Sequence, residues 1–218
     1  MHATATWRFL LRVLSWLPVC FLVWYLAASQ WARPAGSVSS MVARSVQPGI
    51  VKQVEVTGST VAFVTDVKVH TPERRLAVLA PEVNSSADTF GSALFLSLML
   101  ASGARWTKTA AGLLLLLPFQ GWGIAFDALA QIVRASTYTV AGGGIGADSF
   151  NWIAAGYQFG SLVFPTLIPV LAWGMFCRQY IADLKVPLSS TSGSGGAPLV
   201  PSSRPTQSAT GHHAQHHS

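Results

Sequence analysis

The hydrophobic residues of this chain fall into long apolar stretches separated by short polar segments. A helix needs roughly 20 apolar residues to cross a membrane, because the hydrocarbon core is about 30 Å thick and each residue adds about 1.5 Å. Four stretches meet or approach that length: 9–28, 89–103, 109 to a point between 126 and 134, and 152–177. The pattern therefore predicts four transmembrane helices, the second of them short.

Residues 50–83 follow a different period. Apolar and more polar residues alternate along 61–69, which is the two-residue repeat of a half-buried strand. Segments 51–57 and 76–83 flank it as weaker strands, so we expect a small antiparallel three-stranded β-element. A sheet of this size has too little core to stand alone and should rest on the helices or on a partner. The alternating apolar residues are Val61, Phe63, Val67 and Val69.

The composition favours a membrane protein. Half of the 218 residues are hydrophobic, only 10% are charged, and the mean hydropathy is +0.42. A soluble domain, by contrast, carries about 25% charged residues. Two cysteines are too few for a disulfide-stapled secreted domain or for a four-thiolate zinc site.

Basic residues at the helix ends predict the orientation. With the N-terminus in the cytoplasm, the short outside loop between the third and fourth helices carries only Arg134. An excess of Lys and Arg on one side predicts that both termini lie in the cytoplasm (N-in/C-in). This asymmetry explains the net charge of +6, so no nucleic-acid partner is expected. The basic residues on the cytoplasmic flanks are Arg8, Arg12, Arg105, Lys108, Arg178 and Lys185.

We therefore expect an α-helical polytopic membrane protein with a β-element outside the membrane. Residues 1–32 would form the first transmembrane helix with its cytoplasmic N-terminus, 33–88 the periplasmic β-element, and 89–182 a three-helix transmembrane region. Residues 183–218 should be a disordered cytoplasmic tail, because they have little apolar surface to bury. The histidines of the tail have no folded frame, so no specific metal site is expected.

The first apolar stretch leaves one alternative open. Two arginines lie at its start and Ala27-Ala28-Ser29 closes it, an arrangement that resembles a cleaved signal peptide. The length of the stretch and its aromatic residues Trp16, Trp24 and Tyr25 favour an uncleaved anchor instead.

The third helix carries a polar stripe. Gln120, Asp127, Gln131 and Arg134 have the spacing of a single helical face. An ionisable group at membrane depth is a functional hypothesis by default, because lipid exposure costs about 2.5–3.5 kcal/mol. Asp127 lies eighteen residues beyond Thr109, near the outer interface, which favours a packing role. Contact with a partner and handling of protons or ions are the alternatives.

The fourth helix contains Pro165 and Pro169, preceded by Tyr157 and Gln158. Prolines kink a spanning helix and free backbone carbonyls, which shapes packing or lines a transport path. The glycine-rich loop 141–146 lacks the Lys-Ser/Thr of a phosphate-binding loop, and we expect a flexible turn.

Polar side chains also gather where the sheet meets the second helix, at Glu82, Asn84 and Asp88. They could form an outer polar site, and capping of the helix by Asn84 or Asp88 is the favoured interpretation. The two thiols, Cys20 and Cys177, lie at different predicted depths. Neither has a histidine base near it, so no catalytic pair and no cofactor are expected.

Three segments of the chain form a distinctive pattern: Pro81-Glu82-Val83-Asn84, Gln120-Gly121-Trp122-Gly123 with Asp127, and Gly156-Tyr157-Gln158-Phe159-Gly160 through Pro165-Thr166-Leu167-Ile168-Pro169. These segments resemble the exosortase H-associated membrane proteins, and the resemblance covers about residues 8–182. It implies association with exosortase H, a polytopic cysteine transpeptidase-like enzyme of bacterial envelopes that processes proteins with a C-terminal sorting signal, and it implies no activity of the chain's own. Residues 84–87 depart from the family pattern, in which a proline with aromatic or aliphatic residues is usual.

Together these features predict a non-catalytic accessory protein of the bacterial inner membrane, whose partners are the lipid bilayer and an exosortase-type transpeptidase. The alternative is a small transporter or channel subunit that uses the polar face of the third helix. An intramembrane enzyme, a third class, would require one of the two cysteines. The residues expected to contact a partner or to hold the structure are Glu82, Asn84, Gln120, Asp127, Gln131, Arg134, Tyr157 and Gln158.

Overall fold

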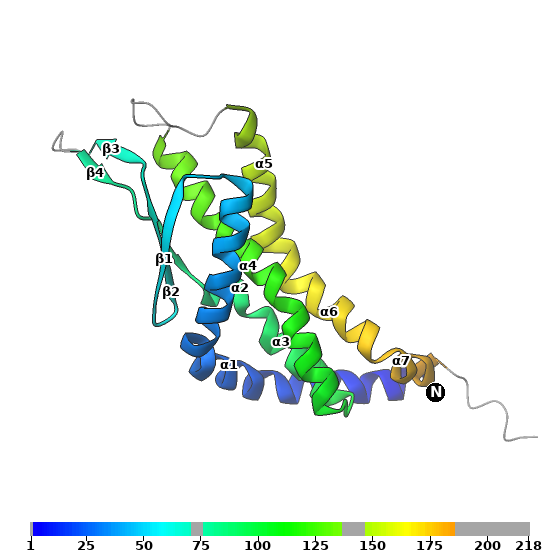
Figure 1. Cartoon of the computed structure of the whole chain (residues 1–218). Helices are drawn as coiled ribbons and strands as arrows, with labels where there is room; N and C mark the ends of the chain where they lie inside the picture. The colour runs from blue at the N-terminus through cyan, green and yellow to red at the C-terminus, as the bar shows by residue number, and fades with distance from the viewer. Residues whose placement is uncertain (1, 71–75, 137–146, 186–218) are drawn as a thin grey trace, which may run out of the picture. The chain divides into compact units, whose positions relative to one another are not determined.

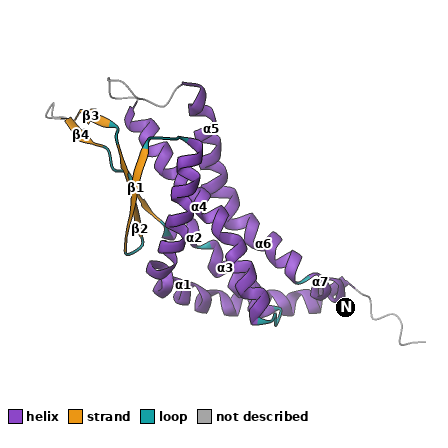
Figure 2. Cartoon of the chain, viewed as in Figure 1, coloured by secondary structure: helices purple, strands orange, loops and turns teal. Residues whose placement is uncertain are grey.

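The computed structural model describes residues 2–70, 76–136 and 147–185, all within the first of two units, which ends at Val186. The predicted loop at 141–146 and most of the predicted tail lie outside the described residues. Helices dominate, and the strands lie to one side of them (Figures 1 and 2). In chain order the first elements are α1 (His2–Val46), β1 (Val51–Thr57), β2 (Thr60–Thr65), β3 (Lys68–His70), β4 (Leu76–Val78) and β5 (Glu82–Asn84). The remaining elements are α2 (Ser86–Thr89), α3 (Gly91–Ala101), α4 (Trp106–Ser136), α5 (Ala147–Gln158), the π-helical turn η1 (Phe159–Val163), α6 (Phe164–Phe176) and α7 (Arg178–Lys185).

Three helical stretches are long and apolar enough to cross a membrane: Thr6–Val46, Trp106–Ala135 and Ser149–Phe176. The second predicted crossing corresponds to a shorter apolar stretch, Ser86–Ala101. The last candidate span is continuous through η1, where the N–H of Phe164 donates to the carbonyl of Phe159, five residues back. Pro165 is the next residue after Phe164. Because proline has no N–H, the carbonyl four residues earlier has no α-helical hydrogen-bond partner.

Helix α1 is longer than the apolar stretch predicted, because it continues to Val46 through residues expected to precede the sheet. Its C-terminal part bends away from its N-terminal part and runs beside α4 (Figure 1). Pro34 lies inside the helix and removes one backbone hydrogen bond there, which permits a bend without ending the helix. Ala32, Ala35 and Ala43 are completely buried, so small side chains let the bent part approach its neighbours closely.

The predicted three-stranded antiparallel sheet is confirmed, but two of the three segments predicted as strands, 61–69 and 76–83, are each divided between two strands. The strand order is β1-β2-β5, whereas β3 and β4 form a separate two-stranded hairpin. The alternating stretch breaks after Thr65, whose hydroxyl donates a 2.6 Å hydrogen bond to the carbonyl of Leu79 and accepts the N–H of Val67. This local turn separates β2 from β3. Segment 76–83, expected to form the third strand, is likewise divided between β4 and β5.

The sheet rests on the helices. Val61, Phe63 and Val83 point inward, are at most 1% exposed, and pack against small side chains of α1 and against Ile124 of α4. On α4, Gln131 donates a 3.2 Å hydrogen bond from Nε2 to the backbone carbonyl of Glu82 in β5. The sheet is therefore fixed to two of the candidate spans rather than joined to them by a free linker.

Glycines permit the closest helix contacts. A Cβ built on Gly160 of η1 would lie 2.7 Å from the Cα of Gly123 in α4, and one on Gly156 would overlap the ring of Phe126. Gly156 and Gly160 are four residues apart and face α4 together, which is the small-xxx-small arrangement that brings membrane helices together.

Candidate functional site

Gln120 joins three helices inside the predicted membrane region. Its Oε1 accepts a 2.7 Å hydrogen bond from Nε1 of Trp31 in α1, and its Nε2 donates a 2.7 Å hydrogen bond to Oγ of Ser92 in α3. The side chain is only 5% exposed. A buried amide with both ends paired fixes helix register, because separating the helices would leave polar groups without partners.

A second series of hydrogen bonds runs from α1 toward the sheet. Trp24 donates from Nε1 to Oγ1 of Thr89 at 3.3 Å, and that hydroxyl donates to the carbonyl of Ser85 at 2.8 Å. Ser85 in turn donates from Oγ to the carbonyl of Ser59, in the turn between β1 and β2, at 2.7 Å. The start of α2 is thereby tied to both the membrane helices and the sheet.

Asp88 is more deeply buried than a helix-capping residue is expected to be. It is 5% exposed, and its Oδ2 is the one buried side-chain oxygen or nitrogen in the described part of the chain without a hydrogen-bond partner. Its carboxyl group packs on Gly123 of α4, where an added Cβ would lie 2.7 Å from Oδ1. The N-cap position of α2 is occupied by Ser85, and Asn84 accepts the N–H of Ser86 through Oδ1 at 3.1 Å.

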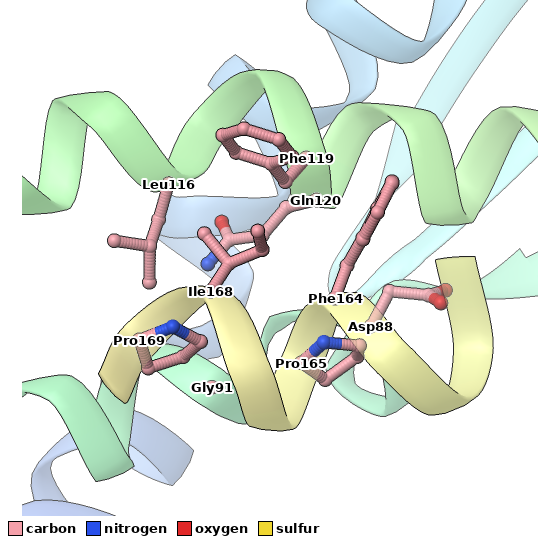
Figure 3. Close-up of a pocket in the computed structure, with 9 residues that line it drawn as sticks. All are labelled: Asp88, Gly91, Leu116, Phe119, Gln120, Phe164, Pro165, Ile168 and Pro169. Carbon is pink, nitrogen blue, oxygen red and sulfur yellow. The ribbon is translucent and has the colours of Figure 1, made fainter. Parts of the chain in front are cut away.

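A cavity of about 10 Å³ adjoins Asp88, between the α2–α3 segment, α4 and α6 (Figure 3). That volume holds about one water molecule and no organic ligand. Figure 3 shows both predicted prolines of the last span on its α6 side and Gln120 on its α4 side. The lining residues are Asp88, Gly91, Leu116, Phe119, Gln120, Phe164, Pro165, Ile168 and Pro169.

The structure divides the polar stripe predicted on the third helix. Gln120 belongs to the buried network, whereas Gln131 binds β5 and Arg134 lies near the C-terminal end of α4. The guanidinium carbon of Arg134 is 5.7 Å from the ring centroid of Tyr157 in α5, which is cation–π distance, and its Nε donates to the carbonyl of Ala130. Asp127 is half-buried between these groups.

The other predicted residues lie at the surface. Glu82 and Asn84 have exposed side chains at β5, and Gln158 is exposed at the end of α5. Exposed carboxylate and amide groups beside a fixed sheet can bind a partner by hydrogen bonds without rearrangement of the fold.

Both thiols are packed inside the fold. Cys20 and Cys177 are free and buried, and Sγ of Cys177 lies 3.4 Å from Oγ of Ser102 and 3.7 Å from the sulfur of Met99. Within the part of the chain that was searched, no group of three or more His, Cys, Asp or Glu side chains could hold a metal ion.

Sequence reasoning missed Trp31, Ser92 and the depth of Asp88. Asp88 precedes an apolar run, which is also the pattern of a helix cap, and its burial depends on Gly123, 35 positions along the chain. The sequence signal that could have identified the site is the presence of glycines on both α4 and η1, since glycine marks positions where another group approaches the backbone closely.

Comparison with known proteins identifies a family. The family model described as exosortase H-associated membrane protein matches residues 3–180, which include the strands of the described residues and the helices from the second residue of α1 to the start of α7. No curated protein and no solved structure matches. The resemblance carried by the three sequence segments is confirmed.

Proposed function

The chain belongs to the exosortase H-associated membrane protein family, and from this premise we propose that it is a non-catalytic accessory subunit. It docks on a polytopic exosortase-type transpeptidase, or on the substrate of that enzyme, in the bacterial inner membrane. The observation that carries the proposal is the sheet fixed to α1 and α4, which exposes polar side chains of β1 on its other side. Lys52, Gln53 and Glu55 of the edge strand β1 are exposed there.

The proposal includes a topology of four crossings with both termini in the cytoplasm. The Ser86–Ala101 stretch would be the additional crossing, second in chain order, and its 16 residues span about 24 Å. Its support is the position of the basic residues: Arg105, Lys108 and Arg178 line one cavity between the α3–α4 turn and the start of α7. Such clustering at one end of the helices is the arrangement that the positive-inside rule requires.

Deletion and purification together test the accessory role. We expect the chain, purified from native membranes under mild conditions, to carry the transpeptidase, and its deletion to reduce sorting of proteins with the C-terminal signal. A matched variant with Glu55→Gln keeps the shape of β1 and should weaken the association without loss of the fold. Recovery of the chain alone, together with unchanged sorting after deletion, would refute the accessory role.

A transporter or channel subunit is the second candidate. It is favoured by one observation, the buried and unpartnered Oδ2 of Asp88 beside a proline-containing span. Asp88→Asn separates the two functions, because a transporter should lose flux whereas an accessory subunit should retain sorting. Flux of ions or protons in proteoliposomes that contain only this chain would support transport.

A further inference from the structure

A second cavity lies at the opposite end of the helices from the sheet. Its volume is about 520 Å³, and it is formed where the turn between α3 and α4 meets the junction of α6 and α7. Unlike the small cavity at Asp88, it is large enough to hold a polar group of several atoms. Its lining residues are Ser102, Gly103, Ala104, Arg105, Lys108, Phe176, Cys177, Arg178, Gln179 and Tyr180.

The charge of this cavity is positive. Arg105, Lys108 and Arg178 line it, and no carboxylate side chain does. Among the described side chains, the one ion pair joins Lys52 and Asp66 beside the sheet. No carboxylate among them therefore forms an ion pair with Arg105, Lys108 or Arg178. Lys108 is held at the wall by a 3.3 Å hydrogen bond from Nζ to the carbonyl of Phe176.

The helix ends beside the cavity carry partial charges of both signs. Helix α4 begins at Trp106, directly beside the cavity, and is 31 residues long. The first N–H groups of a long helix have no partners within the helix and carry a partial positive charge. The C-terminal ends of α3 and α6 carry partial negative charge and adjoin the same cavity at Ser102 and Phe176. The three basic side chains therefore set its sign and attract an anion, most simply a phosphate group.

The surroundings indicate which kind of phosphate compound this is. The candidate span of α4 starts at Trp106 and that of α6 ends at Phe176, so the cavity lies where the apolar helices meet the membrane surface. Trp106 is 75% exposed, as an indole at the interface of a bilayer would be. On these two helices, Leu114 and Met175 expose apolar side chains on which acyl chains can lie.

We propose that this cavity binds the headgroup of an anionic phospholipid. The phosphate would accept hydrogen bonds from the three basic side chains, while the acyl chains follow the apolar surfaces of α4 and α6. Basic pockets between transmembrane helices on the cytoplasmic side are the general form of such sites. The inference does not depend on the accessory role, because it uses only the cavity and the helix ends.

Lipid retention by the purified full-length chain tests the proposal. Native mass spectrometry in a neutral detergent would compare phosphatidylglycerol with phosphatidylcholine, and inorganic phosphate would be added as a competitor. We expect preferential retention of phosphatidylglycerol, with about a fivefold loss of affinity for each basic residue replaced by glutamine. Lys108→Gln changes an exposed side chain and measures the loss of affinity for one basic residue. The triple variant, which adds Arg105→Gln and Arg178→Gln, measures the combined loss for all three.

Arg12→Gln is the matched control, because Arg12 is exposed on α1 and does not line the cavity. It should leave retention unchanged, and Arg105→Lys should preserve most of it. Equal retention of both lipids, or an equal loss with Arg12→Gln, would show only general attraction to the membrane and overturn the proposal. Displacement of the lipid by inorganic phosphate at equal concentration would overturn it in favour of a soluble phosphate compound.

Discussion

Gly160→Ala should loosen the packing between η1 and α4. The new Cβ would lie 2.7 Å from the Cα of Gly123, which is backbone and cannot rotate away. Ordinary contact begins near 3.4 Å, so the helices must separate by about 0.7 Å at this point. A gap of that size removes a quarter to a half of the attraction between facing atoms, and overpacking of this kind costs about 1–3 kcal/mol.

Gly174→Ala is the matched control in the same span. Its nearest neighbour would be Cδ1 of Ile181 at 3.9 Å, which is ordinary contact, so no helix has to move. Alanine is also the better helix former by about 1 kcal/mol, so this variant should unfold at the same temperature or higher.

Thermal unfolding of both variants in detergent, followed by tryptophan fluorescence, measures the difference. We expect Gly160→Ala to melt roughly 2–12 °C below the parent, from about 2–4 °C for each kcal/mol in a chain of this size. Equal melting temperatures for the two variants would refute the close approach of η1 and α4.

Three further predictions concern the core and the thiols. Gln120→Leu should cost about 1–3 kcal/mol of unfolding free energy, because Nε1 of Trp31 loses its acceptor; the melting temperature measures it, and Trp31→Phe in the same chain should recover part of the loss. Phe63→Ala should cost about 3–5 kcal/mol, since Phe63 is completely buried between sheet and helices; Phe150→Ala, at a half-exposed ring, should change little by the same measurement. Cys20→Ser and Cys177→Ser should both retain sorting in a deletion strain, and complete loss with either would favour an intramembrane enzyme.

Much of the fold could be predicted from the length of the apolar stretches and the spacing of the apolar residues within the chain. Stretch 109–126 falls within α4, and stretch 152–177 ends one residue beyond the α5–α6 span. The alternation around Val61 and Phe63 marks β2 and its buried face. The sequence signal for these elements is strong because each buries a continuous apolar surface.

The rest depends on partners distant in the chain. The end of α1 lacks a strong apolar pattern and contains Pro34, and it is helical because its small residues fit against α4 and the sheet. Strand β5 has three residues and forms by pairing with β2 through Val61 and Val83. The depth of Asp88 likewise follows from Gly123, and no local pattern around residue 88 indicates it.

The most direct test of the accessory role is a photo-crosslinker at Gln53 on the exposed side of β1, activated in native membranes. A matched crosslinker at Leu114, which is 65% exposed on α4, reports contacts along the membrane helices. We expect position 53 to capture a polytopic transpeptidase or its substrate, and position 114 to capture it much less. Capture of only a second copy of this chain, or the same products from both positions, would contradict docking through the sheet.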